Sequence, residues 1–190
     1  MKEGDERDPP FFFQKPADAL VTDGRVPYPD LTDDLQYEVE LVVAIGATPA
    51  GGSADDALAA VFGYAVGLDM TRRDRQRESF RMGLPWEIGK SFDHSAPCGT
   101  LHPVSAVGHC MEGDIRLTVN GDVRQSARLG QMIWNVPEMI QQLSRQYRLM
   151  PGDLIFSGTP AGVGPVQTGD RLEGAITGLS PLQVEIVAPA

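Results

Sequence analysis

Two carboxylates stand two residues apart at the entrance to an apolar stretch of the chain. Glu38 and Glu40 precede Leu41–Ile45, in which every residue is apolar. Such a run predicts a strand that is covered on both faces, and side chains two residues apart in a strand point to the same face. Two like charges that lead into a core are costly unless a cation lies between them. The spacing therefore indicates a site for a hard divalent cation, and the alternative is a strand end that shows both acids to solvent.

A third carboxylate, Asp69, ends a second largely apolar stretch, Tyr64–Leu68. If it lies beside the pair, the three side chains would form an all-oxygen site. Such a site suits Mg²⁺ or Mn²⁺ better than zinc, which prefers His and Cys ligands. The three histidines (His94, His102 and His109) show no zinc spacing, and we interpret them as structural.

Lys90 is a further candidate, because it lies between an apolar turn, Leu84–Trp86, and Phe92. Partial desolvation of its ammonium group would let it stabilise a developing oxyanion. The alternative is a lysine whose stem lies over Trp86 while its head stays in water.

Two other residues could reach a site from irregular segments. Thr159, in the Gly/Pro-rich stretch 158–165, could offer its hydroxyl and neighbouring amides to a carboxylate. That stretch lacks the Gly-Lys-Ser/Thr ending of a phosphate loop, which excludes a nucleotide site. Lys15 follows Phe11–Phe13, which predict a short buried strand that delivers the lysine to a sheet edge or a site; the alternative is a surface lysine beside a Pro turn.

The elements that would position these residues are mostly strands. Asn120-Gly121 between alternating stretches is a strong hairpin signal. Three helices are predicted: one capped by Ser53, with Leu58, Val61 and Phe62 as its buried stripe and Gly63 as its end; a charged one at Thr71–Arg81, stopped by Gly83; and one at Pro137–Arg148. With roughly ten short strands, the pattern favours an α+β fold in which β dominates, a mixed and rolled sheet. We expect a flexible charged arm at residues 1–10 and a single domain at residues 11–190.

Composition limits the classes of function. The formal charge of −10 argues against a surface for nucleic acid or anionic membrane. Two cysteines, Cys98 and Cys110, are too few for a disulfide framework and suit a reducing compartment. No apolar run approaches a membrane span, and the charged start lacks the apolar middle of a signal peptide, so we expect a cytoplasmic protein.

Four ordered motifs carry a resemblance to a known family: Tyr37–Leu41, Gly67–Gln76, Gly89–Asp93 and Gly152–Gly164. Together they resemble the fumarylacetoacetate hydrolase family, and the opening Phe11–Pro16 is most similar to its branch that acts on fumarylpyruvate and other acylpyruvates. The resemblance implies a rolled, mainly β fold, usually a homodimer, that binds Mg²⁺ or Mn²⁺.

The resemblance also implies roles for particular residues. The metal ligands would be Glu38, Glu40 and Asp69. The positions that line the family's substrate pocket correspond to Arg73, Gln76, Lys90 and Thr159, and Lys15 matches the lysine of the family's Lys-Pro motif.

The reaction implied is metal-dependent hydrolysis of a carbon–carbon bond in a 2,4-dioxo acid. Lys90 and Gln76 would stabilise the tetrahedral oxyanion, and Arg73 or Thr159 would hold the substrate carboxylate. Decarboxylation of oxaloacetate, or keto–enol isomerisation, on the same site is an alternative.

One expected feature of the family does not appear in the sequence. The family usually carries an Asn-Tyr-x-x-His-x-x-Glu segment whose His and Glu activate water, and no histidine precedes Glu38 here. General-base help is typically worth about a hundred- to ten-thousand-fold. A third expectation is therefore a metal-binding homodimer with little turnover.

Overall fold

The computed structural model describes residues 8–189, so most of the predicted arm lies outside the described residues. Asp8–Pro10 carry no helix or strand. The helices are α1 (Ala54–Ala59), α2 (Arg73–Met82), α3 (Glu87–Lys90), α4 (Val104–Val107) and α5 (Val136–Ser144), with 3-10 turns at Ala17–Ala19 and Leu129–Gln131. The strands are β1 (Leu20–Val21), β2 (Arg25–Pro27), β3 (Leu35–Tyr37), β4 (Val39–Ile45), β5 (Val61–Leu68), β6 (Thr71–Arg72), β7 (Ala96–Pro97), β8 (His102–Pro103), β9 (Asp114–Val119), β10 (Asp122–Arg128), β11 (Leu154–Phe156), β12 (Gly164–Pro165), β13 (Arg171–Ile176) and β14 (Leu182–Val187).

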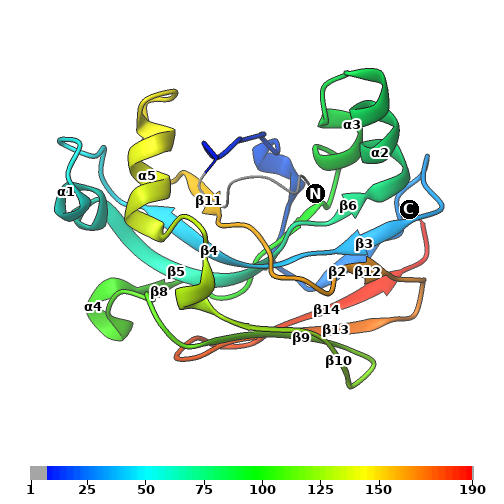
Figure 1. Ribbon diagram of the computed structural model, residues 1–190. Helices are drawn as coiled ribbons and strands as arrows, with labels where there is room; N and C mark the ends of the chain where they lie inside the picture. The colour runs from blue at the N-terminus through cyan, green and yellow to red at the C-terminus, as the bar shows by residue number, and fades with distance from the viewer. Residues whose placement is uncertain (1–7, 190) are drawn as a thin grey trace.

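The strands form two facing layers, and most of the helices lie on the outer side of one of them (Figure 1). One layer is a five-stranded sheet in the order β10-β9-β13-β14-β2. The other is built mainly on a four-stranded sheet, β11-β4-β5-β8, which a three-stranded sheet, β12-β3-β6, extends. Both parallel and antiparallel pairs occur. The prediction of a mainly β, mixed and rolled α+β fold is confirmed.

The core lies between the two layers. Every residue of β4 is buried, as the apolar run predicted. The layers approach closely at Gly174 of β13, where a Cβ would lie 3.0 Å from Val66 Cγ1 and 3.3 Å from Val39 Cγ2. A side chain at this point would push the five-stranded sheet away from β4 and β5.

Several local signals placed turns and helix ends correctly, although the helix predicted to end at Arg148 ends at Ser144 and the one predicted to begin at Thr71 begins at Arg73. Asn120 and Gly121, with φ of 53° and 87°, connect β9 to β10 as the hairpin signal predicted. Ser53 and Asp56 form a capping box at α1, and Gly83 ends α2 with φ of 68°. The return strand β10 contains a bulge between Val123 and Gln125.

Two predictions about apolar residues were wrong. Val61 and Phe62 do not continue the helix, because α1 ends at Ala59 and both residues begin β5. Gly63 is not a helix end either: it lies within β5, where a Cβ would meet His102 O at 2.2 Å. The close pairing of β5 with β8 therefore requires glycine at this position.

Phe11–Phe13 form no strand, which corrects the second prediction. Phe11 is 70% exposed, and its ring packs edge-on against Trp86 at a centroid distance of 5.1 Å. The segment lies on α3 instead of in a sheet, and Ser91 Oγ donates to Gln14 O.

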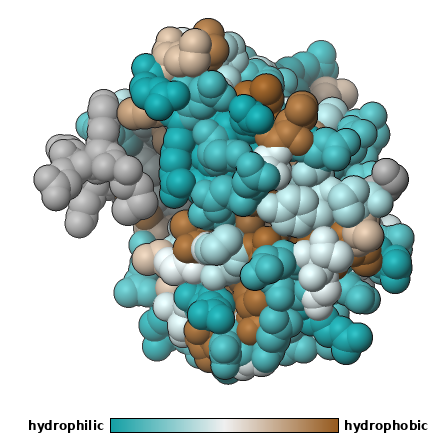
Figure 2. Space-filling view, turned by 90° about the vertical axis from the view of Figure 1, so that its right-hand side faces the viewer, coloured by the Kyte–Doolittle hydropathy of each residue, from teal (hydrophilic) through white to brown (hydrophobic). Residues whose placement is uncertain are grey.

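The surface carries scattered apolar groups. Figure 2 shows hydrophobic residues between hydrophilic ones on one face, and the end of α2 and the turn after it expose Phe80, Met82 and Leu84. Within residues 8–189, none of the helices combines the length and the apolarity that crossing a membrane requires.

Candidate metal centre

The three predicted carboxylates come together in the structure. Val39 of β4 pairs with Leu68 of β5, and Asp69 N donates to Glu38 O at 2.9 Å, which places Asp69 beside the glutamate pair. Each of Glu38, Glu40 and Asp69 offers an oxygen within 4.8 Å of the others. Their exposed fractions are 8%, 3% and 2%, so the alternative of a solvent-exposed strand end does not hold.

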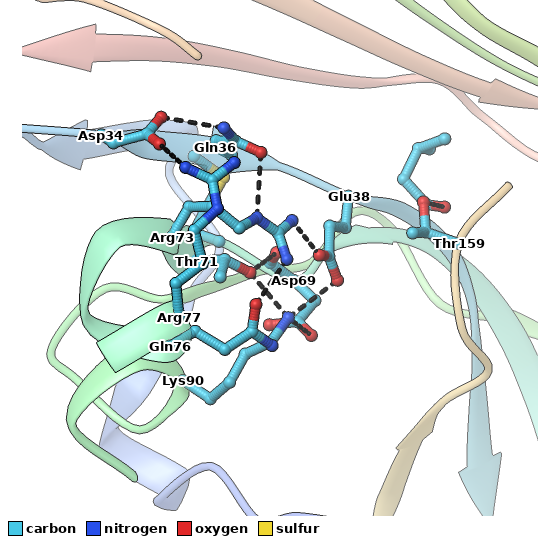
Figure 3. Close-up of polar contacts among 12 residues, drawn as sticks. Asp34, Gln36, Glu38, Asp69, Thr71, Arg73, Gln76, Arg77, Lys90 and Thr159 are labelled. Carbon is cyan, nitrogen blue, oxygen red and sulfur yellow. Dashed lines mark hydrogen bonds and ion pairs between the residues drawn. The ribbon is translucent and has the colours of Figure 1, made fainter. Parts of the chain in front are cut away.

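The Lys90 ammonium lies between two of these carboxylates, Glu38 and Asp69 (Figure 3). The ammonium lies 2.7 Å from Glu38 Oε2, 2.7 Å from Asp69 Oδ2 and 2.6 Å from Thr71 Oγ1, so all three of its N–H donors are used. The side chain is 2% exposed, which excludes a lysine with its head in water. Gly89 permits this position, because a Cβ there would lie 2.8 Å from Gln76 N and would push α3 away from α2.

Lys15 reaches the same centre from the N-terminal segment. Its Nζ lies 2.8 Å from Asp69 Oδ1 and donates to Met70 O at 3.2 Å and to Lys90 O. Burial lowers the pKa of Lys15, against the opposing effect of Asp69. The surface alternative for Lys15 is therefore wrong, although the buried strand expected to deliver it does not form.

Arg73 lies at the first residue of α2 and links Glu38 to two amides. Its guanidinium donates to Glu38 Oε1, to Gln36 Oε1 at 2.9 Å and to Gln76 Oε1 at 2.6 Å. Gln36 is held in turn by Asp34 at 2.8 Å. The amide nitrogen of Gln76 has no hydrogen-bond partner within residues 8–189, so this donor is available to a ligand.

Glu40 lies on the side of the group that faces the loop after β11. Gly158 N donates to Glu40 Oε2 at 2.9 Å. Burial, followed by the neighbouring charges of Asp69 and Glu38, raises the pKa of Glu40 well above its ordinary value. A carboxyl in this state favours a proton or a metal ion over an isolated negative charge.

Thr159 is close to the group but is engaged with the protein. Its hydroxyl donates to Val39 O at 2.8 Å and accepts from Gln125 Nε2 at 2.9 Å. The role of Thr159 in holding a substrate carboxylate stays a prediction. To make that contact, its hydroxyl would have to give up the hydrogen bond to Val39 O and donate to the substrate instead.

The donor set suits a hard divalent cation. All three acidic side chains offer oxygen, which is the ligand that Mg²⁺ and Mn²⁺ prefer. Asp69 Oδ1 is buried and, despite its ion pair with Lys15, has no hydrogen-bond partner among the described residues. Sequence reasoning missed the supporting residues Thr71, Gln36 and Gln125. Thr71 and Gln36 each stand two residues from a predicted ligand, Asp69 and Glu38, which is a weak local signal, whereas Gln125 has none.

Comparisons with known proteins agree with this geometry. The family model described as "Fumarylacetoacetate (FAA) hydrolase C-terminal" matches residues 1–187. A fumarylpyruvate hydrolase of a Ralstonia species is 42% identical over 177 residues, which cover 93% of this chain and 92% of that protein. A mitochondrial oxaloacetate tautomerase of Bos taurus is 36% identical over 181 residues, covering 95% of this chain and 82% of that protein.

A solved structure is similar in both fold and sequence. The crystal structure of fumarylpyruvate hydrolase from Pseudomonas aeruginosa in complex with Mn²⁺ and pyruvate superposes with a TM-score of 0.92 at 51% identity. The match covers 96% of this chain and 81% of that one.

Proposed function

Because the chain belongs to the fumarylacetoacetate hydrolase family, we propose that it is a divalent-metal-dependent hydrolase that cleaves a carbon–carbon bond in a 2,4-dioxo acid, such as fumarylpyruvate or another acylpyruvate. The observation that carries the proposal is the buried group of three carboxylates, two of which accept from Lys90. The 42% identity to a fumarylpyruvate hydrolase supports the substrate class. A similar structure that holds Mn²⁺ and pyruvate supports both a metal and a pyruvate-containing ligand.

Glu38, Glu40 and Asp69 would hold the metal, as Mg²⁺ or Mn²⁺. When bound, such an ion supplies a Lewis acid that stabilises negative charge on the substrate oxygens as the bond breaks. Arg73 would keep Glu38 oriented, and Lys15 would do the same for Asp69.

In the reaction, water adds to the carbonyl distal to the carboxylate. The Gln76 amide would donate to the oxyanion that forms there. Lys90 would add a second donor once it exchanges one of its three protein contacts for substrate oxygen. The bond between the former carbonyl carbon and the methylene then breaks, which releases a carboxylic acid and the enolate of pyruvate. One water is consumed in the sum: its hydroxyl group ends in the acid, and the proton that it loses on attack is balanced by the proton that the methylene carbon gains to complete pyruvate.

Formal charge at the centre is compatible with this substrate. The group holds three carboxylates and three cations: Lys15, Lys90 and Arg73 pair with Glu38 and Asp69, and Glu40 accepts from Gly158 N, so the formal charges sum to zero when all are ionised. A divalent cation together with a dianionic dioxo acid, such as fumarylpyruvate, adds no net charge.

The test is loss of acylpyruvate absorbance with Mn²⁺, with Mg²⁺ and with EDTA, for the wild type and for Glu40→Gln. We expect consumption of fumarylpyruvate that requires metal and that Glu40→Gln reduces by at least about a hundredfold, consistent with loss of a metal ligand. Saturable binding of metal without loss of substrate would instead favour a metal-binding protein with little turnover.

A second candidate function is keto–enol isomerisation or decarboxylation of oxaloacetate. The 36% identity to an oxaloacetate tautomerase supports it, and neither reaction requires an attacking water. Running the same two proteins on oxaloacetate distinguishes the candidates, because turnover of oxaloacetate alone would reject the hydrolase.

We also propose that the protein assembles as a homodimer. The family resemblance supports this, and light scattering after size-exclusion chromatography tests it. The expected mass is twice the 20.5 kDa of the chain, and a monomer would reject the dimer without affecting the proposed chemistry.

A further inference from the structure

Strand β11 stops pairing with β4 near the end of β4 that carries the candidate metal ligands. Strand β11 pairs with β4 through Phe156 opposite Val42, and the following Ser157 N donates to Leu41 O at 3.1 Å. Continued in the same register, the chain would place Thr159 opposite Val39. The backbone ladder does not continue, because Gly158 N turns to the Glu40 carboxylate at 2.9 Å.

Side chains take over the two backbone groups of Val39 that the ladder no longer satisfies. Thr159 Oγ1 donates to Val39 O at 2.8 Å, and Gln125 Oε1 accepts from Val39 N at 3.0 Å. Val39 stands between Glu38 and Glu40. These two hydrogen bonds therefore hold the piece of backbone from which both glutamates project.

Gln125 comes from the opposite layer and connects three segments. It follows the bulge of β10 and is 0% exposed. Its amide nitrogen donates to Thr159 Oγ1 at 2.9 Å and to Pro160 O at 2.8 Å, so both of its N–H groups and its oxygen have partners. The loop lies directly on β10 here, since a Cβ at Gly162 would meet Arg124 O at 2.2 Å.

We propose that Gln125 is a positioning residue of the metal centre. Its side-chain amide replaces the missing strand partner of Val39, and it also fixes the loop that carries Gly158. This inference rests on the proposed metal-dependent function. Gln125 lies at one remove from the ligands: it acts on Glu38 and Glu40 through the Val39 backbone, and on Glu40 through the loop and the Gly158 amide.

The test replaces the amide by a side chain of similar size, Gln125→Met. In the metal-free protein we expect hydrogen exchange at the Val39 amide to accelerate at least tenfold relative to other amides of β4. The affinity for Mn²⁺ should fall about 10- to 100-fold, as is typical when an outer-shell partner is lost. Calorimetry and the paramagnetic resonance of free Mn²⁺ measure this affinity.

Leu117→Ala is the matched control. Leu117 lies opposite Gln125 on β9 and is also 0% exposed, so its truncation removes core packing in the same sheet. We expect it to lower stability while leaving the Mn²⁺ dissociation constant within about twofold of the wild type. Equal Mn²⁺ affinity in Gln125→Met and the wild type would overturn the proposal and leave Gln125 as an ordinary core residue.

Thr159→Val decides the matter if Gln125→Met does not fold. It removes the hydroxyl that joins Gln125 to Val39, at a position that is only half-buried. Weaker Mn²⁺ binding supports the proposal, and unchanged binding overturns it. Absence of Mn²⁺ binding in the wild type would instead reject the proposed function, while Val39 exchange would still report on the contact itself.

Discussion

Lys90 neutralises buried carboxylates in the protein, and its removal should therefore be costly. It donates to Glu38 and Asp69 at 2.7 Å each and is 2% exposed. Removing one partner of a buried ion pair typically costs about 3–5 kcal/mol, because the remaining charge stays desolvated. We expect Lys90→Met to lose stability of this order in urea unfolding with EDTA, and to regain a large part of it with Mn²⁺.

The control for Lys90→Met is Arg77→Gln, which removes an ion pair that is exposed to solvent. Arg77 pairs with Asp34 at 3.1 Å, but its side chain is 68% exposed. Exposed pairs are worth about 0–1 kcal/mol, so Arg77→Gln should change little in either buffer. A loss in Lys90→Met no larger than that in Arg77→Gln would contradict the role assigned to Lys90.

Cys98 should be unreactive in the folded protein. Burial raises the pKa of its thiol to about 11, from an ordinary value of 9.0. Because the folded state favours the neutral thiol, its contribution to stability is complete below about pH 9 and is lost as the pH rises through about 11. Thiol labelling of a Cys110→Ala variant at pH 8 should be at least tenfold slower in buffer than in urea, and equal rates would contradict the assigned burial.

The candidate metal ligands could be predicted from the sequence, whereas the residues that support them could not. Spacing within one strand put Glu38 and Glu40 on the same face, and Asp69 ended a neighbouring strand. Gln125 could not be identified in this way, because its partners lie 86 and 34 residues away in sequence. A polar residue in a short return strand gives no sign that it reaches across to another layer.

Among the structural elements, the loop between β11 and β12 should tolerate little change. Gly162 and Gly152 have similar left-handed backbones, with φ of 103° and 98°, but a Cβ at Gly152 meets nothing within 4 Å. Gly152→Ala should therefore cost only the backbone strain of about 1–2 kcal/mol. Gly162→Ala would also force the loop away from Arg124 O at 2.2 Å, which should add about 1–3 kcal/mol and weaken Mn²⁺ binding.

Urea unfolding and Mn²⁺ titration of the two glycine variants test this difference. The comparison isolates the contact with β10, since backbone strain is common to both positions. Equal stability and equal Mn²⁺ affinity in the two variants would show that the loop can move without affecting the site.

Elements with local signals were predicted well, and elements that depend on distant partners were not. The Asn120-Gly121 turn and the Ser53 cap act within a few residues, so the sequence near them is sufficient. Phe11–Phe13 and Val61 were misassigned because their conformations depend on Trp86 and on the pairing of β5 with β4 and β8, which no local pattern specifies.

At the scale of the whole molecule, the candidate metal centre joins segments from most of the chain. Its side chains come from the N-terminal segment, from the ends of β4 and β5, and from α2 and α3, and the loop after β11 closes one side. Few of these contacts would survive in an unfolded chain. A ligand bound at this point should therefore stabilise the fold as a unit.

Mn²⁺ should raise the free energy of unfolding of the wild type by about 2.7 kcal/mol when its free concentration is a hundred times its dissociation constant. Urea unfolding in EDTA and in Mn²⁺ measures this difference directly. Glu40→Gln should lose most of it, because Glu40 is one of three carboxylates and is 3% exposed. Glu173→Gln, an exposed acid on β13, should retain it. If Mn²⁺ stabilised Glu40→Gln as much as the wild type, the ion would bind elsewhere, and only the ion pairs with Lys90, Lys15 and Arg73 would neutralise Glu38 and Asp69.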